Sequence, residues 1–394
     1  MVLQAVTSVA IICYTQRALQ AYEGVPMGLN CGIVGLPNVG KSTIFSALSS
    51  AQAEAANYPF CTIDPNIGMV SVPDARLDKI AELIPAQRVI PATVEFVDIA
   101  GLVAGASKGE GLGNRFLASI REVGVLVHVV RCFEDPDIVH VDNRIDPASD
   151  IETITIELAL ADLETVEKRY QKVSKMTRLD KETAKQAAQL LPVLEQLREA
   201  LGNGIAARSL NLTEDQLKII YDLHLITLKP MIYVCNVDEE SIGTDNEFVS
   251  VVRGIAESEG SETVVICGKI EAEIAALDTP QERAEFLEAV GLEESGLIQL
   301  IHSGYRTLGL RTFFTAGSDE NRAWTFHAGD KAPQAAGVIH TDFEKGFIKA
   351  EVYHCNDLFT YGSEQKVKEA GKLRIEGKEY VVQDGDVMHF RFNL

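Results

Sequence analysis

The segment that decides the fold reads Asn30-Cys-Gly-Ile-Val-Gly35-Leu-Pro-Asn-Val-Gly40-Lys41-Ser42-Thr43. It holds the pattern G-x-x-x-x-G-K-[ST] after an apolar, strand-like run and before residues 42–50, whose apolar side chains recur at helical spacing. The N–H groups of such a glycine-rich turn, together with the positive N-terminus of the following helix, cradle phosphates. The sequence therefore predicts a phosphate-binding loop, with Lys41 on the β/γ-phosphate oxygens and the Ser42 hydroxyl on Mg²⁺.

The remaining pattern predicts an α/β protein with two additions. Short β-branched runs at 94–97, 125–130, 230–235 and 263–267 are mostly separated by helix-like segments, which is typical of a doubly wound, mostly parallel sheet. Residues 151–176 and 181–201 carry a helical period without a strand between them, which predicts an inserted antiparallel helical hairpin. After residue 306, aromatic and β-branched runs between turns predict a separate small mixed domain.

Domain boundaries follow from these changes of pattern. We expect the nucleotide-binding domain to comprise residues 27–150 and 212–304, the hairpin residues 151–211, and the C-terminal domain residues 305–394. Residues 1–26 precede a second methionine, Met27, and are expected to lie outside the fold as an N-terminal extension.

Composition excludes several functional classes. The 394 residues carry a formal net charge of −21, so no general attraction to DNA is expected and any RNA contact must be local. No apolar run approaches the roughly 20 residues of a membrane span, so we expect no membrane partner. The seven cysteines are scattered and form no C-x-x-C pair, which indicates a reducing, cytoplasmic location.

A metal and γ-phosphate sensor is predicted downstream of the phosphate loop. Asp98-Ile-Ala-Gly101 follows the strand-like run 94–97, so Asp98 can join the Mg²⁺ shell while the Gly101 N–H senses the γ-phosphate. Thr62 lies in the loop before the second strand and is the natural switch threonine, which would bind Mg²⁺ when the γ-phosphate is present.

The purine site is predicted at Asn236-Val237-Asp238-Glu239, where guanine-specific switches carry N-K-x-D. In that motif the aspartate accepts the two donors of guanine, and the lysine stem covers the base. Here Glu239 and Val237 take those two positions, so we expect Asn236, Val237 and Glu239 to bind ATP in preference to GTP. The alternative, in which Glu239 reaches guanine, stays open.

The glutamine that orients water in Ras-type switches is replaced by Leu102. Candidates to assist the attacking water are His140 and Lys108, both in loop-like segments. Asn38, within the phosphate loop, is a candidate to help coordinate a monovalent cation such as K⁺ in place of an arginine finger.

These motifs together resemble the YchF or Obg-like ATPase family of P-loop proteins. The marks of the resemblance are residues 35–43 (GLPNVGKST), 56–62 (ANYPFCT), 96–102 (FVDIAGL), 105–113 (GASKGEGLG), 128–133 (HVVRCF) and 333–347 (PQAAGVIHTDFEKGF). The resemblance implies a G domain, the helical hairpin, a C-terminal TGS domain of β-grasp type, a preference for ATP, and the ribosome, as large subunit or 70S particle, as partner.

The resemblance also implies site residues. It places the Mg²⁺ ligands on Ser42 and Thr62, the adenine contact on Val237 and a catalytic histidine on His140. The nucleotide loop falls on Asn38, Val39, Gly40, Lys41, Ser42 and Thr43. The segment Ile266-Cys-Gly-Lys269 departs from the Ser-Ala that switch NTPases often carry, which affects the last wall of the base pocket.

A cationic stretch lies where the hairpin turns. It consists of Lys168, Arg169, Lys172, Lys175, Arg178, Lys181 and Lys185, against only Asp180 and Glu182. Such a stretch alone is more typical of a solvated helix face, but with the resemblance we expect it to contact ribosomal RNA. We expect a monomeric switch ATPase; the alternatives are a nucleotide-gated adaptor with incidental hydrolysis and a GTPase of the Obg type.

Overall fold

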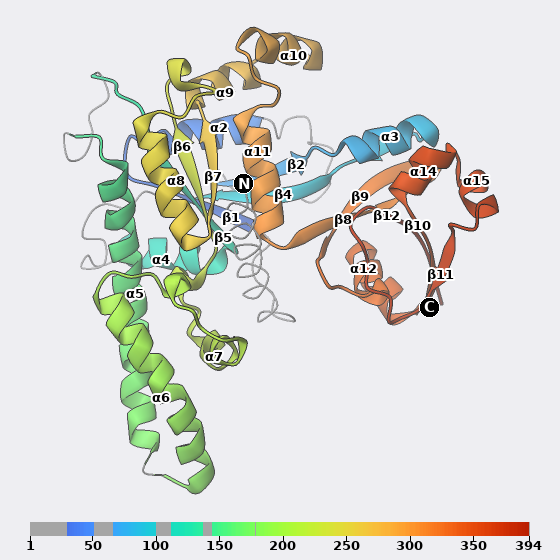
Figure 1. Ribbon diagram of the computed structural model, residues 1–394. Coiled ribbons are helices and arrows are strands. Elements are labelled where there is room, and N and C mark those ends of the chain that lie inside the picture. The colour runs from blue at the N-terminus through green and yellow to red at the C-terminus, as the bar shows by residue number, and fades with distance from the viewer. Residues whose placement is uncertain (1–29, 51–65, 100–111, 137–143, 178, 394) are drawn as a thin grey trace, which may run out of the picture. The chain divides into compact units, whose positions relative to one another are not determined.

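The computed structural model describes residues 30–50, 66–99, 112–136, 144–177 and 179–393 (Figure 1). The chain forms two compact units. The first contains residues 1–69 and 95–304, and the second contains residues 70–94 and 305–394.

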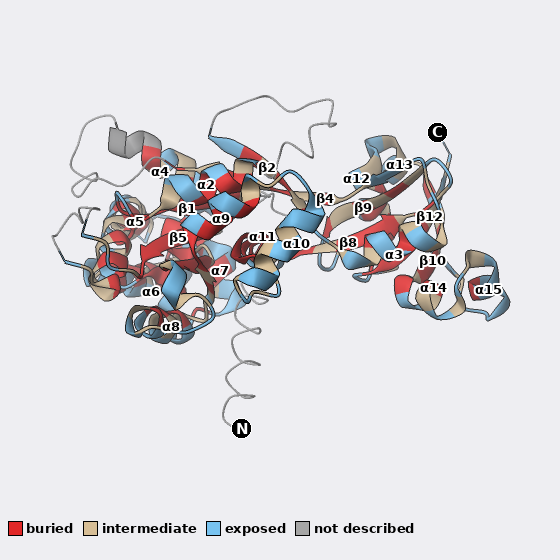
Figure 2. Cartoon of the chain, turned by 90° about the horizontal axis from the view of Figure 1, so that it is seen from above, coloured by how far each residue is buried: buried red, intermediate tan, exposed pale blue. Residues whose placement is uncertain are grey.

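The first unit is built on a six-stranded sheet with the order β2-β4-β1-β5-β6-β7, in which β2 and β4 cross the boundary between the two units. Its strands are β1 Asn30–Val34, β2 Ile67–Val72, β4 Ala92–Asp98, β5 Val125–Arg131, β6 Met231–Asn236 and β7 Glu262–Ile266. The pairs β4-β1, β1-β5, β5-β6 and β6-β7 are parallel, and every residue of β5 and β6 is buried. Strand β5 is drawn red, the colour of buried residues, in Figure 2. Strands covered on both faces explain the continuous apolar runs, and the predicted α/β fold class is confirmed.

Helices lie between and after these strands in the chain. They are α2 Lys41–Ser50, α4 Leu112–Glu122, α7 Glu214–Ile220, α8 Glu247–Glu259, α9 Gly268–Ala275, α10 Pro280–Ala289 and α11 Gly296–Thr307. Short 3-10 helices are η3 Ala207–Ser209, η4 Tyr221–Leu223, η5 Ile226–Leu228 and η6 Glu239–Ser241. No helix in the described ranges is both long and apolar enough to cross a membrane.

The predicted hairpin consists of α5 Pro147–Met176 and α6 Lys181–Gly202 (Figure 1). The two helices share a hydrophobic core, which includes Val166, Val173, Leu194 and Leu197 and continues into α7 through Leu217 and Ile220. The buried Asp162 carboxylate ties α5 to the segment before β6. It accepts hydrogen bonds from the backbone N–H groups of Ile226 and Thr227 at 2.9 and 2.7 Å.

The second unit is a mixed sheet with the order β11-β10-β12-β8-β9-β3. Its elements are β3 Arg88–Ile90, β8 Leu310–Thr315, β9 Glu320–His327, β10 Phe347–His354, β11 Arg374–Glu376, β12 Asp386–Phe392, α3 Ala75–Leu83, α12 Ala332–Ile339, α13 Thr341–Lys345, α14 Cys355–Tyr361 and α15 Glu364–Glu369. The hairpin β8-β9 is antiparallel, β12 runs parallel to β8, and the alanines of α12 pack on Phe313 and Phe326. A helix packed on a sheet of this order is the expected β-grasp arrangement.

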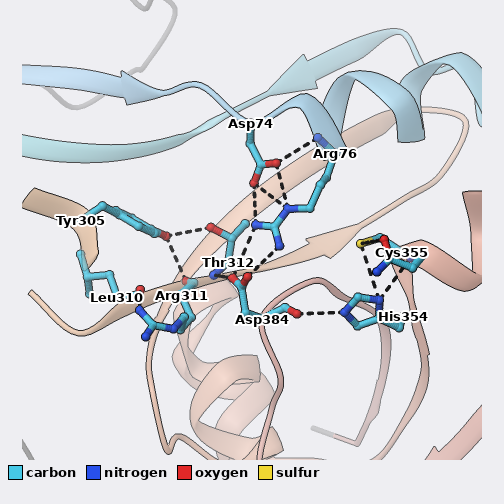
Figure 3. Close-up of polar contacts among 10 residues, drawn as sticks. Asp74, Arg76, Tyr305, Leu310, Arg311, Thr312, His354, Cys355 and Asp384 are labelled. Carbon is cyan, nitrogen blue, oxygen red and sulfur yellow. Dashed lines mark hydrogen bonds and ion pairs between the residues drawn. The ribbon is translucent and has the colours of Figure 1, made fainter. Parts of the chain in front are cut away.

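Residues 70–94 belong to this second unit, whereas the sequence placed them with the nucleotide-binding domain. Strand β3 pairs in parallel with β9, and the Arg76 guanidinium joins Asp74 and Asp384 at 2.8 and 2.7 Å (Figure 3). Asp384 in turn accepts a hydrogen bond from the Thr312 backbone N–H at 2.9 Å. The physical reason is that α3 buries only Leu77 and Ile80, too little for a core of its own.

Candidate functional site

The phosphate loop connects β1 to α2, as the motif predicts. Two residues of this loop adopt positive φ angles, Asn38 at 63° and Gly40 at 94°. A Cβ atom on Gly40 would lie 2.1 Å from Nδ2 of Asn236, so glycine is required both by the backbone angle and by this close approach. The second glycine of the motif therefore lets the loop contact the base-side loops.

Lys41 and Asp98 meet at the carboxyl end of the sheet. Because β4 lies parallel to β1 with Asp98 in register with Ile33, the last residue of β4 stands beside the phosphate loop. Nζ of Lys41 forms an ion pair with Oδ1 of Asp98, and the two side chains are only 12% and 20% exposed. The sequence assigned Lys41 to phosphate and Asp98 to metal as separate sites. In the structure these two residues form one cluster.

The donor set around Lys41 fits Mg²⁺. Ser42 and Thr43 are exposed in the first turn of α2, and Asp98 supplies a carboxylate at the neighbouring Lys41. In the part of the chain that the structure describes, no group of three His, Cys, Asp or Glu residues could hold a metal ion. One carboxylate and a hydroxyl, with phosphate oxygens completing the shell, is the kind of site that Mg²⁺ takes and that Zn²⁺ does not.

Asn236 joins three segments of the site. It ends β6, is 5% exposed, and donates a hydrogen bond from Nδ2 to the backbone oxygen of Val39 at 2.9 Å. Its Oδ1 accepts a hydrogen bond from the N–H of Gly268 at 3.0 Å, at the start of α9. The sequence assigned Asn236 to the purine alone; in the structure its amide also holds the phosphate loop and the last base loop together.

Val237 and Glu239 lie on the loop after β6. The backbone N–H of Val237 donates to Ile266 at 2.8 Å, and its buried side chain lines a cavity of about 210 Å³ together with Cys267. The carboxylate of Glu239 forms an ion pair with Nζ of Lys269. The sequence contained Lys269 in its unusual last loop, but nothing in a linear pattern indicates that this lysine meets Glu239.

Several predicted site residues lie outside the described ranges. They are Thr62, Gly101, Leu102, Lys108 and His140. The roles of Thr62 in metal binding and of Gly101 and His140 in catalysis therefore stay predictions.

The described cations of the hairpin fall into two groups, those that pair with an acidic residue and those that are exposed. Lys168 pairs with Glu164 at 2.6 Å, and Arg169 pairs with Asp222 at 2.8 Å. The other described cations are exposed, namely Lys172, Lys175, Lys181 and Lys185. Beside them Leu179, in the turn between the helices, is 63% exposed. Arg178 lies outside the described ranges.

Comparison with known proteins places this geometry in context. A family model described as a 50S ribosome-binding GTPase matches residues 30–167, and one described as YchF-GTPase_C, a protein of unknown function, matches residues 310–393. The ribosome-binding ATPase YchF of Bacillus subtilis (strain 168) is 55% identical over 370 residues, covering 93% of this chain and 100% of that protein. Its namesake from Escherichia coli O157:H7 is 54% identical over 368 residues, with the same shares covered.

A solved structure is also similar. The structure described as the Schizosaccharomyces pombe YchF GTPase is 38% identical, covers 93% of this chain and 98% of that chain, and has a TM-score of 0.84. These relatives confirm the family resemblance drawn from the motifs, while their names divide between ATPase and GTPase.

Proposed function

The chain belongs to the YchF family of ribosome-binding ATPases, and on this premise we propose that it binds and hydrolyses ATP with Mg²⁺ and associates with the ribosome. The observation that carries the enzymatic part is the contact of Lys41 with Asp98 at the end of the phosphate loop. That contact brings a phosphate-binding cation and a metal-binding carboxylate to one point, which a P-loop hydrolase requires.

Each residue has a defined task in this proposal. Lys41 and the N–H groups of the phosphate loop bind the β- and γ-phosphates at the N-terminus of α2. Ser42, Thr62 and Asp98 would hold Mg²⁺, which when bound neutralises phosphate charge. Asn38 would help bind K⁺. The backbone N–H of Gly101 would contact the γ-phosphate.

His140 completes the proposed site. A neutral imidazole can accept a proton from water or orient it for attack, which Leu102 cannot do because an alkyl side chain has no hydrogen-bonding group. His140 would therefore take the place of the glutamine that Ras-type switches use.

The first experiment is a paired titration of Mg-ATP and Mg-GTP by calorimetry. We expect tighter binding of ATP, and we expect Lys41→Ala to weaken ATP binding by roughly 10- to 100-fold, since a charge-assisted contact to phosphate contributes about 1.5–3 kcal/mol. Undetectable ATP binding by the unmodified protein, or unchanged binding by the variant, would contradict the proposal.

We propose the hairpin as the ribosome-binding arm. Its exposed cations, Lys172, Lys175, Lys181 and Lys185, offer local phosphate recognition on a chain of net charge −21. Changing them together to Ser should weaken co-sedimentation with ribosomes and flatten its salt dependence. Lys168→Ser is the matched control, because Lys168 is already paired with Glu164. An unchanged salt profile in the fourfold variant would remove this assignment. A ribosomal partner would also place the protein in the cytoplasm.

A second candidate function is favoured by Leu102. Without a glutamine, nucleotide could set only the conformation of a ribosome-binding adaptor, with hydrolysis incidental. Single-turnover hydrolysis with and without ribosomes separates the two functions. Acceleration by ribosomes supports the switch ATPase, and no hydrolysis under either condition supports the adaptor.

A further inference from the structure

The residue at the guanine-reading position, Glu239, pairs with a lysine from a neighbouring segment. Glu239 opens the short helix η6, three residues after the end of β6, and Lys269 is the second residue of α9. Their side chains form an ion pair that spans the two loops of the purine pocket.

The backbones that carry this pair are firmly held. Val237 donates its N–H to the oxygen of Ile266 at 2.8 Å, and Gly268 donates its N–H to Asn236 at 3.0 Å. Both bonds join the end of β6 and its following loop to the end of β7 and the start of α9, within three residues of the ion pair. Lys269 and Glu239 therefore project from a fixed frame.

The carboxylates near Lys269 favour its cationic form. Its hydrogen bond to Glu239, and then the charge of that carboxylate, raise the pKa of Lys269 above its ordinary value. Glu273, one turn further along α9, adds to this effect. The neighbouring acid Asp238 is engaged elsewhere, since it accepts the backbone N–H of Ser241 at 2.9 Å.

The chemistry of the two purines then favours one of them. Guanine presents adjacent donors, N1–H and the N2 amine, and needs a carboxylate acceptor to read them. Adenine presents an acceptor at N1 and a donor at N6. A carboxylate accepts hydrogen bonds, which is what guanine requires, so a lysine that pairs with the carboxylate removes the preference of this edge for guanine.

We infer that Lys269 is a specificity-determining residue of the nucleotide pocket, because its ion pair with Glu239 withdraws the acceptor that guanine requires. The inference rests on the proposed binding of ATP at this pocket and adds a residue to its purine selection. It assigns the discrimination to a pair of side chains rather than to the replacement of aspartate by Glu239 alone.

The test is Lys269→Met, which retains the aliphatic stem and removes the charge. Dissociation constants for Mg-ATP and Mg-GTP are measured by calorimetry on the full chain. The pair is largely exposed, and exposed ion pairs shift an equilibrium by roughly 1.5- to 5-fold, so we expect the ratio of GTP to ATP affinity to rise about threefold. Lys331→Met is the matched control, since Lys331 pairs with Glu379 in the other unit.

A second variant shows whether the effect of Lys269→Met depends on the ion pair with Glu239. In a Glu239→Gln protein, adding Lys269→Met should leave the ratio unchanged, because no carboxylate remains to be uncovered. If the unmodified protein binds no ATP, the proposed function fails and this inference with it. If it prefers ATP and Lys269→Met leaves the ratio unchanged, or weakens both nucleotides equally, the inference alone is wrong.

Discussion

Replacing Asn236 by Ala tests whether this residue holds the site together or only contacts a purine. In the structure its amide donates to Val39 at 2.9 Å and accepts from Gly268 at 3.0 Å. Both backbone partners are buried. The variant therefore removes two hydrogen bonds and leaves a buried carbonyl and a buried N–H without their partners.

The expected cost is about 2–4 kcal/mol in the free energy of unfolding. Each of the two buried groups left without its partner costs about 1–3 kcal/mol where water cannot replace that partner, which sums to about 2–6 kcal/mol. Water can reach the Val39 side in part, because Ser42 and Thr43 beside it are exposed, so the lower half of the summed range applies.

The assay is urea unfolding without nucleotide, followed by circular dichroism. Hydrogen exchange by mass spectrometry should place the loss of protection in peptides that contain the phosphate loop and residues 266–270. Asn211→Ala is the control, since Asn211 is exposed and surface changes usually stay within about 0.5 kcal/mol. If Asn236→Ala unfolds like the unmodified protein while its affinity for ATP falls, Asn236 acts on the purine alone and the bridging role is refuted.

Two further predictions concern the separate units. Burial, and then the charge of Arg208, lower the pKa of His128 from 6.5 to about 3. As the pH drops below about 6.5, the histidine is therefore protonated in the unfolded chain but not in the folded protein, and the free energy of unfolding falls. We expect His128→Phe to remove about 1 kcal/mol of the stability change between pH 7.5 and 5.5, and parallel pH profiles would contradict this. Arg76→Met should destabilise the second unit by about 1–2 kcal/mol, because it removes the bonds to Asp74 and Asp384 (Figure 3). Fluorescence of the single tryptophan, Trp324, reports that unfolding, and an unchanged transition would count against the ion pairs.

The α/β fold and the phosphate loop could be predicted because their signals are local. The spacing of Gly35, Gly40 and Lys41 requires a turn between a strand and a helix, and the runs that became β5 and β6 are mostly apolar, with buried polar side chains only at His128, Arg131 and Asn236. The hairpin was predictable for the same reason, since its helical period needs no distant partner to be recognised.

The tertiary structure alone decided which distant residues share a contact. Asn236 and Val39 are 197 residues apart, and Arg76 and Asp384 are 308 residues apart. Nothing in the period or composition of either segment predicts such a partner, because the choice depends on how strands order themselves in a sheet. For the same reason, the sequence could not predict that Lys269 pairs with Glu239 or that residues 70–94 belong to the second unit. Both depend on the order of the strands in the folded sheets.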